Sequence, residues 1–241
     1  MVRFARGVLA QYERTRDEID AAASGAAGKM RVGSMAVAMP VLLARAVQAL
    51  KARSARATVQ IEEGDLTHLL PKLRLGELDL FVGRLEPGYA APDLSTEALF
   101  EEPMVAVAGP ASPVAGKAAP GWADLAALPC IMPPPWASLR VKLEQQFHRH
   151  GVQPSTDLME TSSYLATLTF LGERGAVGFL AKSAAESFER QGLCKILDLP
   201  LSLDLPPVGI ITMREGRLSA SSLQLMECLR EAAQAVPPTR E

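Results

Sequence analysis

The sequence is poor in cysteine and in aromatic residues, and each shortage excludes a class of function. It has three cysteines in 241 residues, an odd number without CxxC spacing, so neither a disulfide framework nor a cysteine-based metal or redox site is expected. Twelve aromatic residues (two Trp, three Tyr and seven Phe) are too few for a platform that stacks single-stranded nucleic acid. Lys and Arg number 25 against 27 Asp and Glu, a balance that argues against a polyanionic partner.

Long hydrophobic runs are absent too. No apolar stretch approaches the roughly eighteen residues of a membrane-spanning helix, so no membrane partner is expected. The first twenty residues carry charges of both signs from Arg3 to Asp20, whereas the core of a secretory leader is uncharged. With the odd number of cysteines, this pattern favours a cytoplasmic protein.

Familiar catalytic and nucleotide-binding motifs do not occur. The G-x-S-x-G elbow, the P-loop and the G-x-G-x-x-G fingerprint are all missing from the sequence. His148 and His150 would lie on different faces of a helix, and Glu62 and Glu63 on opposite faces of a strand, so neither pair can act together. His68 stands alone on an expected helix. We therefore expect no enzyme, no catalytic residue, no metal site and no cofactor.

Strands and helices alternate along most of the chain. In the first part they are expected in this order: Met30–Met35, Val41–Ala52, Thr58–Ile61, Leu66–Leu75 and Asp79–Val82. Asp65 suits the N-cap of the second helix, and Gly76 suits its end. This succession predicts a parallel sheet with right-handed crossovers.

The later part repeats the alternation. Strands are expected at Met104–Ala108, Cys130–Met132, Val177–Leu180, Cys194–Leu199 and Pro207–Met213. Helices are expected at Trp122–Leu128, Ser138–His150, Tyr164–Gly172, Ala181–Gln191 and Ser219–Ala235, with Ser138, Ser162 or Ser163, and Ser219 at their starts.

We infer an α/β fold of two Rossmann-like lobes around a central cleft. Lobe I comprises residues 29–105 and 208–241, and lobe II comprises residues 106–207. The last strand and helix then return to lobe I, and the two crossovers make a hinged cleft of the kind that binds small ligands.

Residues 1–28 precede these lobes. Ala5, Leu9, Tyr12 and Ile19 recur at heptad-like spacing with Arg16 on the same line, which indicates a helix. It is either an ordinary amphipathic first helix or a linker or dimerisation helix. The small residues of Ala21–Gly28 are typical of a flexible linker.

An ordered set of segments resembles the effector-binding domain of LysR-type transcriptional regulators. The most informative is L-R-L-G-E-L-D-L-F-V-G-R-L at Leu73–Leu85, where a helix ends at Gly and Leu-Asp leads the third strand. The others follow in the family's order: R-V-G at Arg31–Gly33, a helix beginning near Pro40, E-E-G-D at Glu62–Asp65, E-E-P-M-V-A-V-A at Glu101–Ala108, W-A-D-L at Trp122–Leu125, I-M-P-P-P at Ile131–Pro135 and A-V-G-F-L at Ala176–Leu180. The resemblance covers about residues 29–235.

One branch of the family is the most similar, the one with regulators of aromatic-acid catabolism and of sugar-binding-protein genes. Four segments carry this likeness: G-R-L at Gly83–Leu85, P-P-P-W-A-S-L-R at Pro133–Arg140, M-E-T-S-S at Met159–Ser163 and P-V-G-I-I-T-M-R at Pro207–Arg214. The sequence departs from the family where Arg174, Ala176 and Ala181 replace two glycines and a proline.

The resemblance implies a fold like that of type-2 periplasmic binding proteins, with an effector between the lobes. The implied ligand-binding residues are Ser34, Met35, Ala36, Leu66, Thr67, Arg84, Pro134, Trp136, Ser138, Ser162 and Ser163. Hydroxyls near helix N-termini suit a carboxylate or a polyol, although plain N-capping is the commoner role of a single serine and is compatible with ligand contact.

Arg84, Trp136 and Asp79 each have a structural interpretation beside the functional one. Arg84 could clamp a carboxylate in two-point fashion or form a structural ion pair, for instance with Glu86. Trp136 could wall the cleft or cover the proline loop. Asp79 is expected to bond backbone N–H groups rather than a ligand.

The leading hypothesis is the ligand-sensing and oligomerisation domain of a LysR-family regulator that binds a small metabolite, an organic acid by preference. The resemblance implies a homodimer or homotetramer, with the Val41–Ala52 helix and the Thr58–Glu62 strand in the contact. DNA would be bound through the family's N-terminal winged helix-turn-helix, which is not seen in this sequence; the first helix resembles the linker helix that follows it. The alternative is a solute-binding protein of a transporter, and an enzyme on the same fold comes third.

Overall fold

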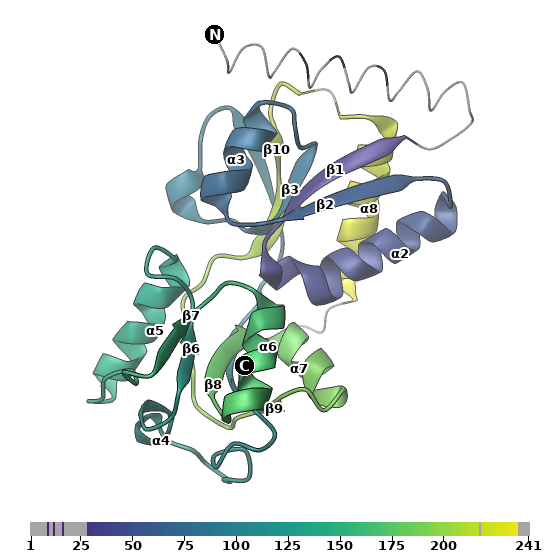
Figure 1. Ribbon diagram of the computed structural model, residues 1–241. Coiled ribbons are helices and arrows are strands. Elements are labelled where there is room, and N and C mark those ends of the chain that lie inside the picture. The colour runs from purple at the N-terminus through teal and green to yellow at the C-terminus, as the bar shows by residue number, and fades with distance from the viewer. Residues whose placement is uncertain (1–8, 10–11, 13–15, 17–27, 217, 236–241) are drawn as a thin grey trace. The chain divides into compact units, whose positions relative to one another are not determined.

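The computed structural model describes residues 9, 12, 16, 28–216 and 218–235 (Figure 1). They form two α/β units: one takes in the described residues up to Glu101 and from Pro206 onward, and the other is Glu102–Leu205. The expected first helix and linker lie almost wholly outside the described residues. Of the expected helix, only Leu9, Tyr12 and Arg16 are described, and all three are helical.

The first unit is built on one five-stranded sheet. Its elements are β1 (Lys29–Ser34), a 3-10 turn (Ala36–Ala38), a π-helical turn (Met39–Leu43), α2 (Ala44–Arg53), β2 (Thr58–Glu63), α3 (Leu66–Arg74), β3 (Leu80–Arg84), a second 3-10 turn (Pro87–Tyr89), β4 (Leu94–Phe100), β10 (Val208–Met213) and α8 (Ala220–Gln234). The strand order is β2-β1-β3-β10-β4. β1 runs parallel to β2 and β3, and β10 runs antiparallel to β3 and β4. The expected parallel crossovers and the returning last strand are both present.

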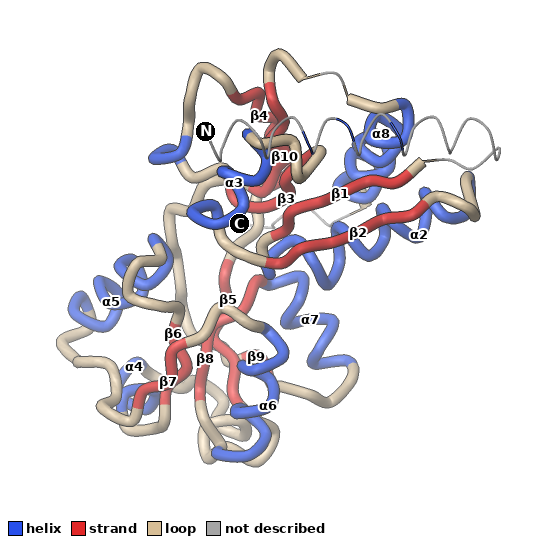
Figure 2. Tube along the Cα trace, turned by 45° about the horizontal axis from the view of Figure 1, so that its top comes forward, coloured by secondary structure: helices blue, strands red, loops and turns tan. Residues whose placement is uncertain are grey.

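Alternation along β3 divides the core of the first unit into two layers. Leu80 and Val82 point toward α2 and α8, whereas Phe81 points toward α3. Figures 1 and 2 show α2 and α8 on one face of the sheet and α3 on the other. The buried Asp79 accepts a hydrogen bond from the backbone N–H of Arg31 at 2.7 Å, as the sequence predicts.

The second unit has a sheet of the same plan. Its elements are β5 (Met104–Ala108), α4 (Trp122–Ala126), β6 (Cys130–Met132), α5 (Ser138–Arg149), β7 (Leu158–Glu160), α6 (Tyr164–Arg174), β8 (Val177–Ala181), α7 (Lys182–Arg190) and β9 (Lys195–Ile196). The strand order is β7-β6-β8-β5-β9. β6 is parallel to β7 and β8, and β5 is antiparallel to β8 and β9.

Aromatic rings fill one side of the second unit. Phe147 meets Trp122 edge-on with ring centroids 4.9 Å apart, and Phe179 of β8 lies on the same cluster. Leu180, the next residue of β8, faces the opposite layer with Leu171 and Ala185. Strand alternation thus separates a layer of packed rings under α4 and α5 from a layer under α6 and α7, in which aliphatic side chains are joined by the Tyr164–Phe188 pair.

The structure corrects four details of the secondary structure. β4 and β7 were not expected, because both are edge strands without a continuous apolar pattern. The expected strand Cys194–Leu199 shortens to β9, which pairs only with Val107 and Ala108. Ser138 is not an N-cap: α5 is capped by Ala137 without a side-chain hydrogen bond.

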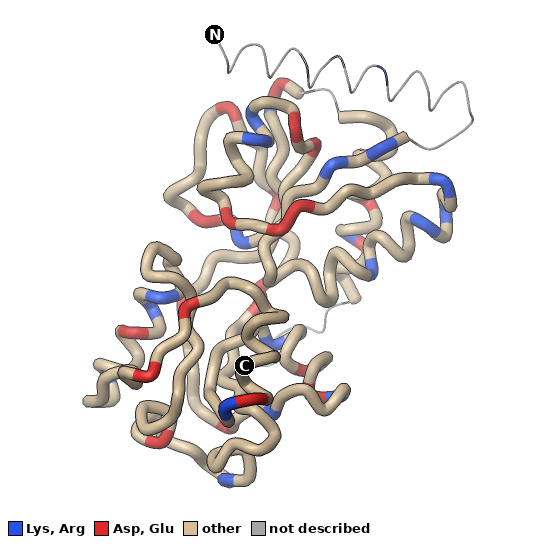
Figure 3. The backbone as a smooth tube through the Cα atoms, in the orientation of Figure 1, with Lys and Arg blue, Asp and Glu red and all other residues tan. Residues whose placement is uncertain are grey.

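The charged positions in the part of the chain that the structure describes are of both signs on each unit (Figure 3). Among these residues, no helix combines the length and the apolar character needed to cross a membrane.

Candidate functional site

Six of the predicted ligand-binding residues gather at one edge of the first unit. Because β1, β2 and β3 are parallel, their carboxyl ends meet at the same edge of the sheet, the usual place for a ligand in such folds. Ser34 and Arg84 are the last residues of β1 and β3, and the segments that follow β1 and β2 carry Met35, Ala36, Leu66 and Thr67.

Burial separates these six residues into two groups. Ser34 is fully buried and its hydroxyl donates to the carbonyl of Met35 at 3.1 Å, and Leu66 lies in the core. Thr67 is exposed, and Met35 and Ala36 are half-buried. The Met35 N–H donates to the Val82 carbonyl at 3.0 Å, and its side chain lies against Gly83, where a Cβ would come within 2.8 Å of the Met35 Cγ.

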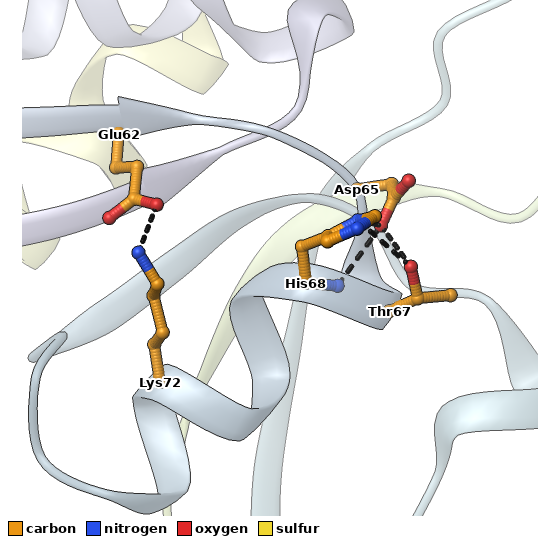
Figure 4. A network of polar contacts seen from close by, with 5 residues as sticks. All are labelled: Glu62, Asp65, Thr67, His68 and Lys72. Atoms are coloured by element: carbon orange, nitrogen blue, oxygen red, sulfur yellow. Dashed lines mark hydrogen bonds and ion pairs between the residues drawn. The ribbon is translucent and has the colours of Figure 1, made fainter. Parts of the chain in front are cut away.

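Asp65 organises the N-terminus of α3 (Figure 4). Its Oδ1 accepts a hydrogen bond from the backbone N–H of His68 at 3.1 Å and another from the Thr67 hydroxyl. The same oxygen lies 2.7 Å from Nδ1 of the His68 ring. Burial alone would raise the Asp65 pKa, but the hydrogen bonds from Thr67 and His68 outweigh it and lower the pKa. The N-cap was predictable from the sequence; the contact with the exposed His68 was not.

Arg84 is buried at the end of β3. Its Nη1 donates to the Pro206 carbonyl at 2.9 Å, and the Leu85 N–H donates to the Pro207 carbonyl at 2.9 Å. The guanidinium therefore fastens the end of β3 to the segment that leads into β10. This contact supports a structural role for Arg84, and its ligand role stays a prediction.

The other five predicted residues gather at the corresponding edge of the second unit. Pro134, Trp136 and Ser138 follow β6, and Ser162 and Ser163 follow β7. The two strands are parallel neighbours. The Ser163 hydroxyl caps α6 by accepting the Ala166 N–H at 3.3 Å, which makes its capping role certain and leaves its ligand role a prediction.

Trp136 is exposed, with a relative accessibility of 71%. Pro134 beside it is buried, while Ser138 and Ser162 are exposed. Both interpretations of Trp136, a wall of the cleft and a cover on the proline loop, remain predictions.

Sequence reasoning missed Arg140, in the first turn of α5. Its Nε donates to Glu144 Oε1 at 2.6 Å, and its Nη1 donates to Glu160 Oε1 at 2.8 Å and to the Pro133 carbonyl at 3.0 Å. Burial alone would lower the Arg140 pKa, but the hydrogen bonds to the two glutamates raise it, so the side chain stays charged. The i,i+4 spacing to Glu144 was a readable signal, whereas the contact with Glu160 was not.

The cysteines and histidines that the structure describes lie in ordinary packing or surface positions. All three cysteines are free and buried, and burial raises the pKa of Cys130 to about 12 and of Cys194 to about 11. No group of three potential metal-ligating side chains occurs within the described ranges. His150 stacks on Trp122 with ring centroids 5.0 Å apart, and His148 is exposed.

Two α/β units, each with three parallel strands followed by an antiparallel one, define a fold like that of the type-2 periplasmic binding proteins, as the sequence predicts. The LysR substrate binding domain family model matches residues 23–234, so the chain belongs to that family.

The curated relatives are transcriptional regulators by name. The chain is 24% identical over 236 residues to the HTH-type transcriptional regulator GbpR of Azospirillum brasilense, covering 97% of this chain and 68% of that one. It is 25% identical over 232 residues to PcaQ of Agrobacterium fabrum, covering 96% and 75%.

Solved structures agree on the fold. CbnR, a LysR family transcriptional regulator, matches with a TM-score of 0.73 at 18% identity, over 95% of this chain and 78% of that one. The effector-binding domain of QuiR in complex with shikimate matches with a TM-score of 0.68 at 15% identity, over 87% and 98%.

Proposed function

We propose that this chain senses an organic acid for a LysR-type transcription regulator. The observation that carries the proposal is the family match over residues 23–234, within which both candidate edges fall. The family assignment and the effector-binding class rest on that match; the acid, the contact residues and the assembly are the proposed part. The comparisons give the alternative of a transporter's solute-binding protein no advantage.

The chemistry of the two edges supports a small hydroxylated acid. Each edge offers side-chain hydroxyls beside the first turn of a helix, where backbone N–H groups and the helix dipole favour an anion. In the first unit the exposed hydroxyl is that of Thr67, and in the second unit those of Ser138 and Ser162 are exposed. Shikimate, the ligand of the structurally similar QuiR domain, is a molecule of this kind.

The proposal extends to the regulator's assembly and location. The chain would form a homodimer or homotetramer through α2 and β2, in the cytoplasm. DNA would be contacted through an N-terminal winged helix-turn-helix; the relative GbpR is named an HTH-type transcriptional regulator. The effector must bind one arrangement of the protein more tightly than another, or nothing is switched.

A thermal-shift screen tests the proposal. Aromatic acids, hydroxylated ring acids, short dicarboxylates and sugars are screened against the wild type, Thr67→Val and Ser162→Ala. A ligand at about 100 times its dissociation constant adds about 2.7 kcal/mol of stability. We expect acids to stabilise the wild type, and each variant to weaken that shift because a hydroxyl at one edge is lost.

Thr169→Val is the matched control, because it removes an exposed hydroxyl from α6 whose bond is to the Leu165 carbonyl at 2.9 Å. It should leave the ligand shift unchanged. Stabilisation by sugars alone would contradict the acid, and a shift that survives both edge variants would contradict the assigned residues.

A further inference from the structure

Arg140 is a buried cation that joins three segments of the second unit. Its residue is 8% exposed, and its guanidinium contacts acceptors in α5, at the end of β7 and just after β6. Pro133 is the first residue after β6, and Glu160 is the last residue of β7. One nitrogen, Nη1, holds both of these strand ends.

Each strand end leads into a loop that carries predicted effector contacts. The β6 loop is residues 133–137, and the β7 loop is residues 161–163. The Thr161 N–H also donates to the Met132 carbonyl at 3.0 Å, so one backbone bond and one side chain tie the two loops together at their origins. Of these two links, only the Arg140 side chain also connects the loops to α5.

We propose that Arg140 is a positioning residue that couples the β6 loop to the β7 loop, so that ordering of one orders the other. Its link to effector binding rests on the proposed function, whereas the coupling itself does not. An effector that contacts Ser162 in the β7 loop would then also order the β6 loop around Trp136, and an effector that contacts Trp136 would order the β7 loop.

The geometry explains why arginine stands here. The planar guanidinium presents several N–H donors in fixed directions, so three acceptors can be held in one arrangement, which the single point charge of lysine cannot do. Glu144 and Glu160 are 40% and 41% exposed, so water can hydrate either carboxylate once it is released. The Glu160 carboxylate therefore does not need Arg140 to replace its hydration. The hydrogen bond between them serves instead to align the end of β7 with α5.

The near-equal exposure of the two glutamates provides a matched pair of variants. Glu160→Gln weakens the contact between the loops, and Glu144→Gln weakens a contact within α5, with the same loss of charge. Backbone amide exchange of the full chain is then compared by mass spectrometry in the absence of any ligand. The reporters are the N–H groups of Ala137, bonded to the Pro134 carbonyl, of Thr161, and of Ala166.

We expect Glu160→Gln to accelerate exchange roughly tenfold in both loops, since it weakens a hydrogen bond between charged groups. Glu144→Gln should leave the β7 loop at the wild-type rate. Arg140→Lys should behave like Glu160→Gln, because the charge remains and the fork is lost.

Three results would overturn the proposal: faster exchange in the β7 loop alone in Glu160→Gln, the same pattern in Glu144→Gln, or full protection of both loops in Arg140→Lys. If the thermal-shift screen finds no ligand, that result would count against the proposed function. The exchange result, which is measured without ligand, would still stand. With a ligand in hand, the wild type should gain protection in both loops and Glu160→Gln in only one.

Discussion

The two units share a sheet plan but differ in how they fill it. In the first unit β1 pairs in parallel with two neighbours, and in the second unit β6 does the same. The fourth strand of each sheet is antiparallel, and it is the first strand after the chain passes from one unit to the other: β10 in the first unit and β5 in the second. The strands β1, β2 and β3 span five or six residues, whereas β6 and β7 span three each.

The two cores also differ in the side chains that fill them. The first unit is packed with aliphatic side chains around Phe81, and the second places Trp122, Phe147 and Phe179 against one another. Short strands leave fewer ladder bonds and fewer inward positions, so larger side chains do more of the packing. One sheet topology therefore accommodates two different ways of burying apolar surface.

The largest expected effect comes from deleting the central ring of each core. Phe81 and Phe147 are both fully buried, and replacing either by Ala should cost about 3–5 kcal/mol of unfolding free energy. Phe147→Ala should cost about 1 kcal/mol more, because it also removes the edge contact with Trp122. Urea unfolding measures both, with Leu165→Ala, whose side chain is 77% exposed, as a control near zero. A larger loss in Phe81→Ala would refute the distinction between the cores.

The next effect concerns two glycines at close approaches, one in each unit. A Cβ at Gly209 would lie 2.2 Å from the Glu97 carbonyl oxygen, and one at Gly109 would lie 1.8 Å from that of Leu171. Each Gly→Ala change should cost about 3 kcal/mol, because backbone must move. Amide exchange should locate the damage in the unit that carries the change. Gly172→Ala, with nothing within 4 Å of its Cβ, should be harmless, and equal losses at all three sites would refute the steric account.

The smallest effect distinguishes the helix caps. Asp65→Ala and Ser163→Ala should each cost about 1 kcal/mol at pH 7. The native pKa of Asp65 is lowered, so its stabilisation is present above the ordinary value of 3.8 and is lost as pH falls through the native pKa. The deficit of Asp65→Ala should therefore shrink below about pH 4, while that of Ser163→Ala persists. Thermal unfolding from pH 7 to pH 3 tests this, and parallel deficits would contradict it.

Local signals in the sequence were enough to predict α3 of the first unit. The α3 helix was predicted from Asp65 and Gly76, a cap and a left-handed stop with φ of +74°, both of which act within the helix itself. Segments of this kind also led to the family assignment, the α/β class and the effector-sensing function. The family match and the similar solved structures confirmed these predictions.

What could not be predicted depends on distant partners. β4 exists because β10, more than a hundred residues later, supplies its ladder. The residues of Leu94–Phe100 show no regular alternation of polar and apolar side chains, so they do not reveal that pairing. Arg140 reaches Glu160 only because β6 and β7 are neighbours, and Arg84 meets Pro206 only because the chain returns.

That return also sets an order of events during synthesis. The second unit is one continuous stretch, Glu102–Leu205, so the ribosome delivers it whole, while β3 and β4 of the first unit still wait for β10 to be made. At about 5–20 residues per second, the gap of roughly a hundred residues lasts about 5–20 seconds. Throughout that interval the apolar edge of β3 is open to pairing with other nascent chains, so translation speed and chaperone capture should govern the yield of this protein.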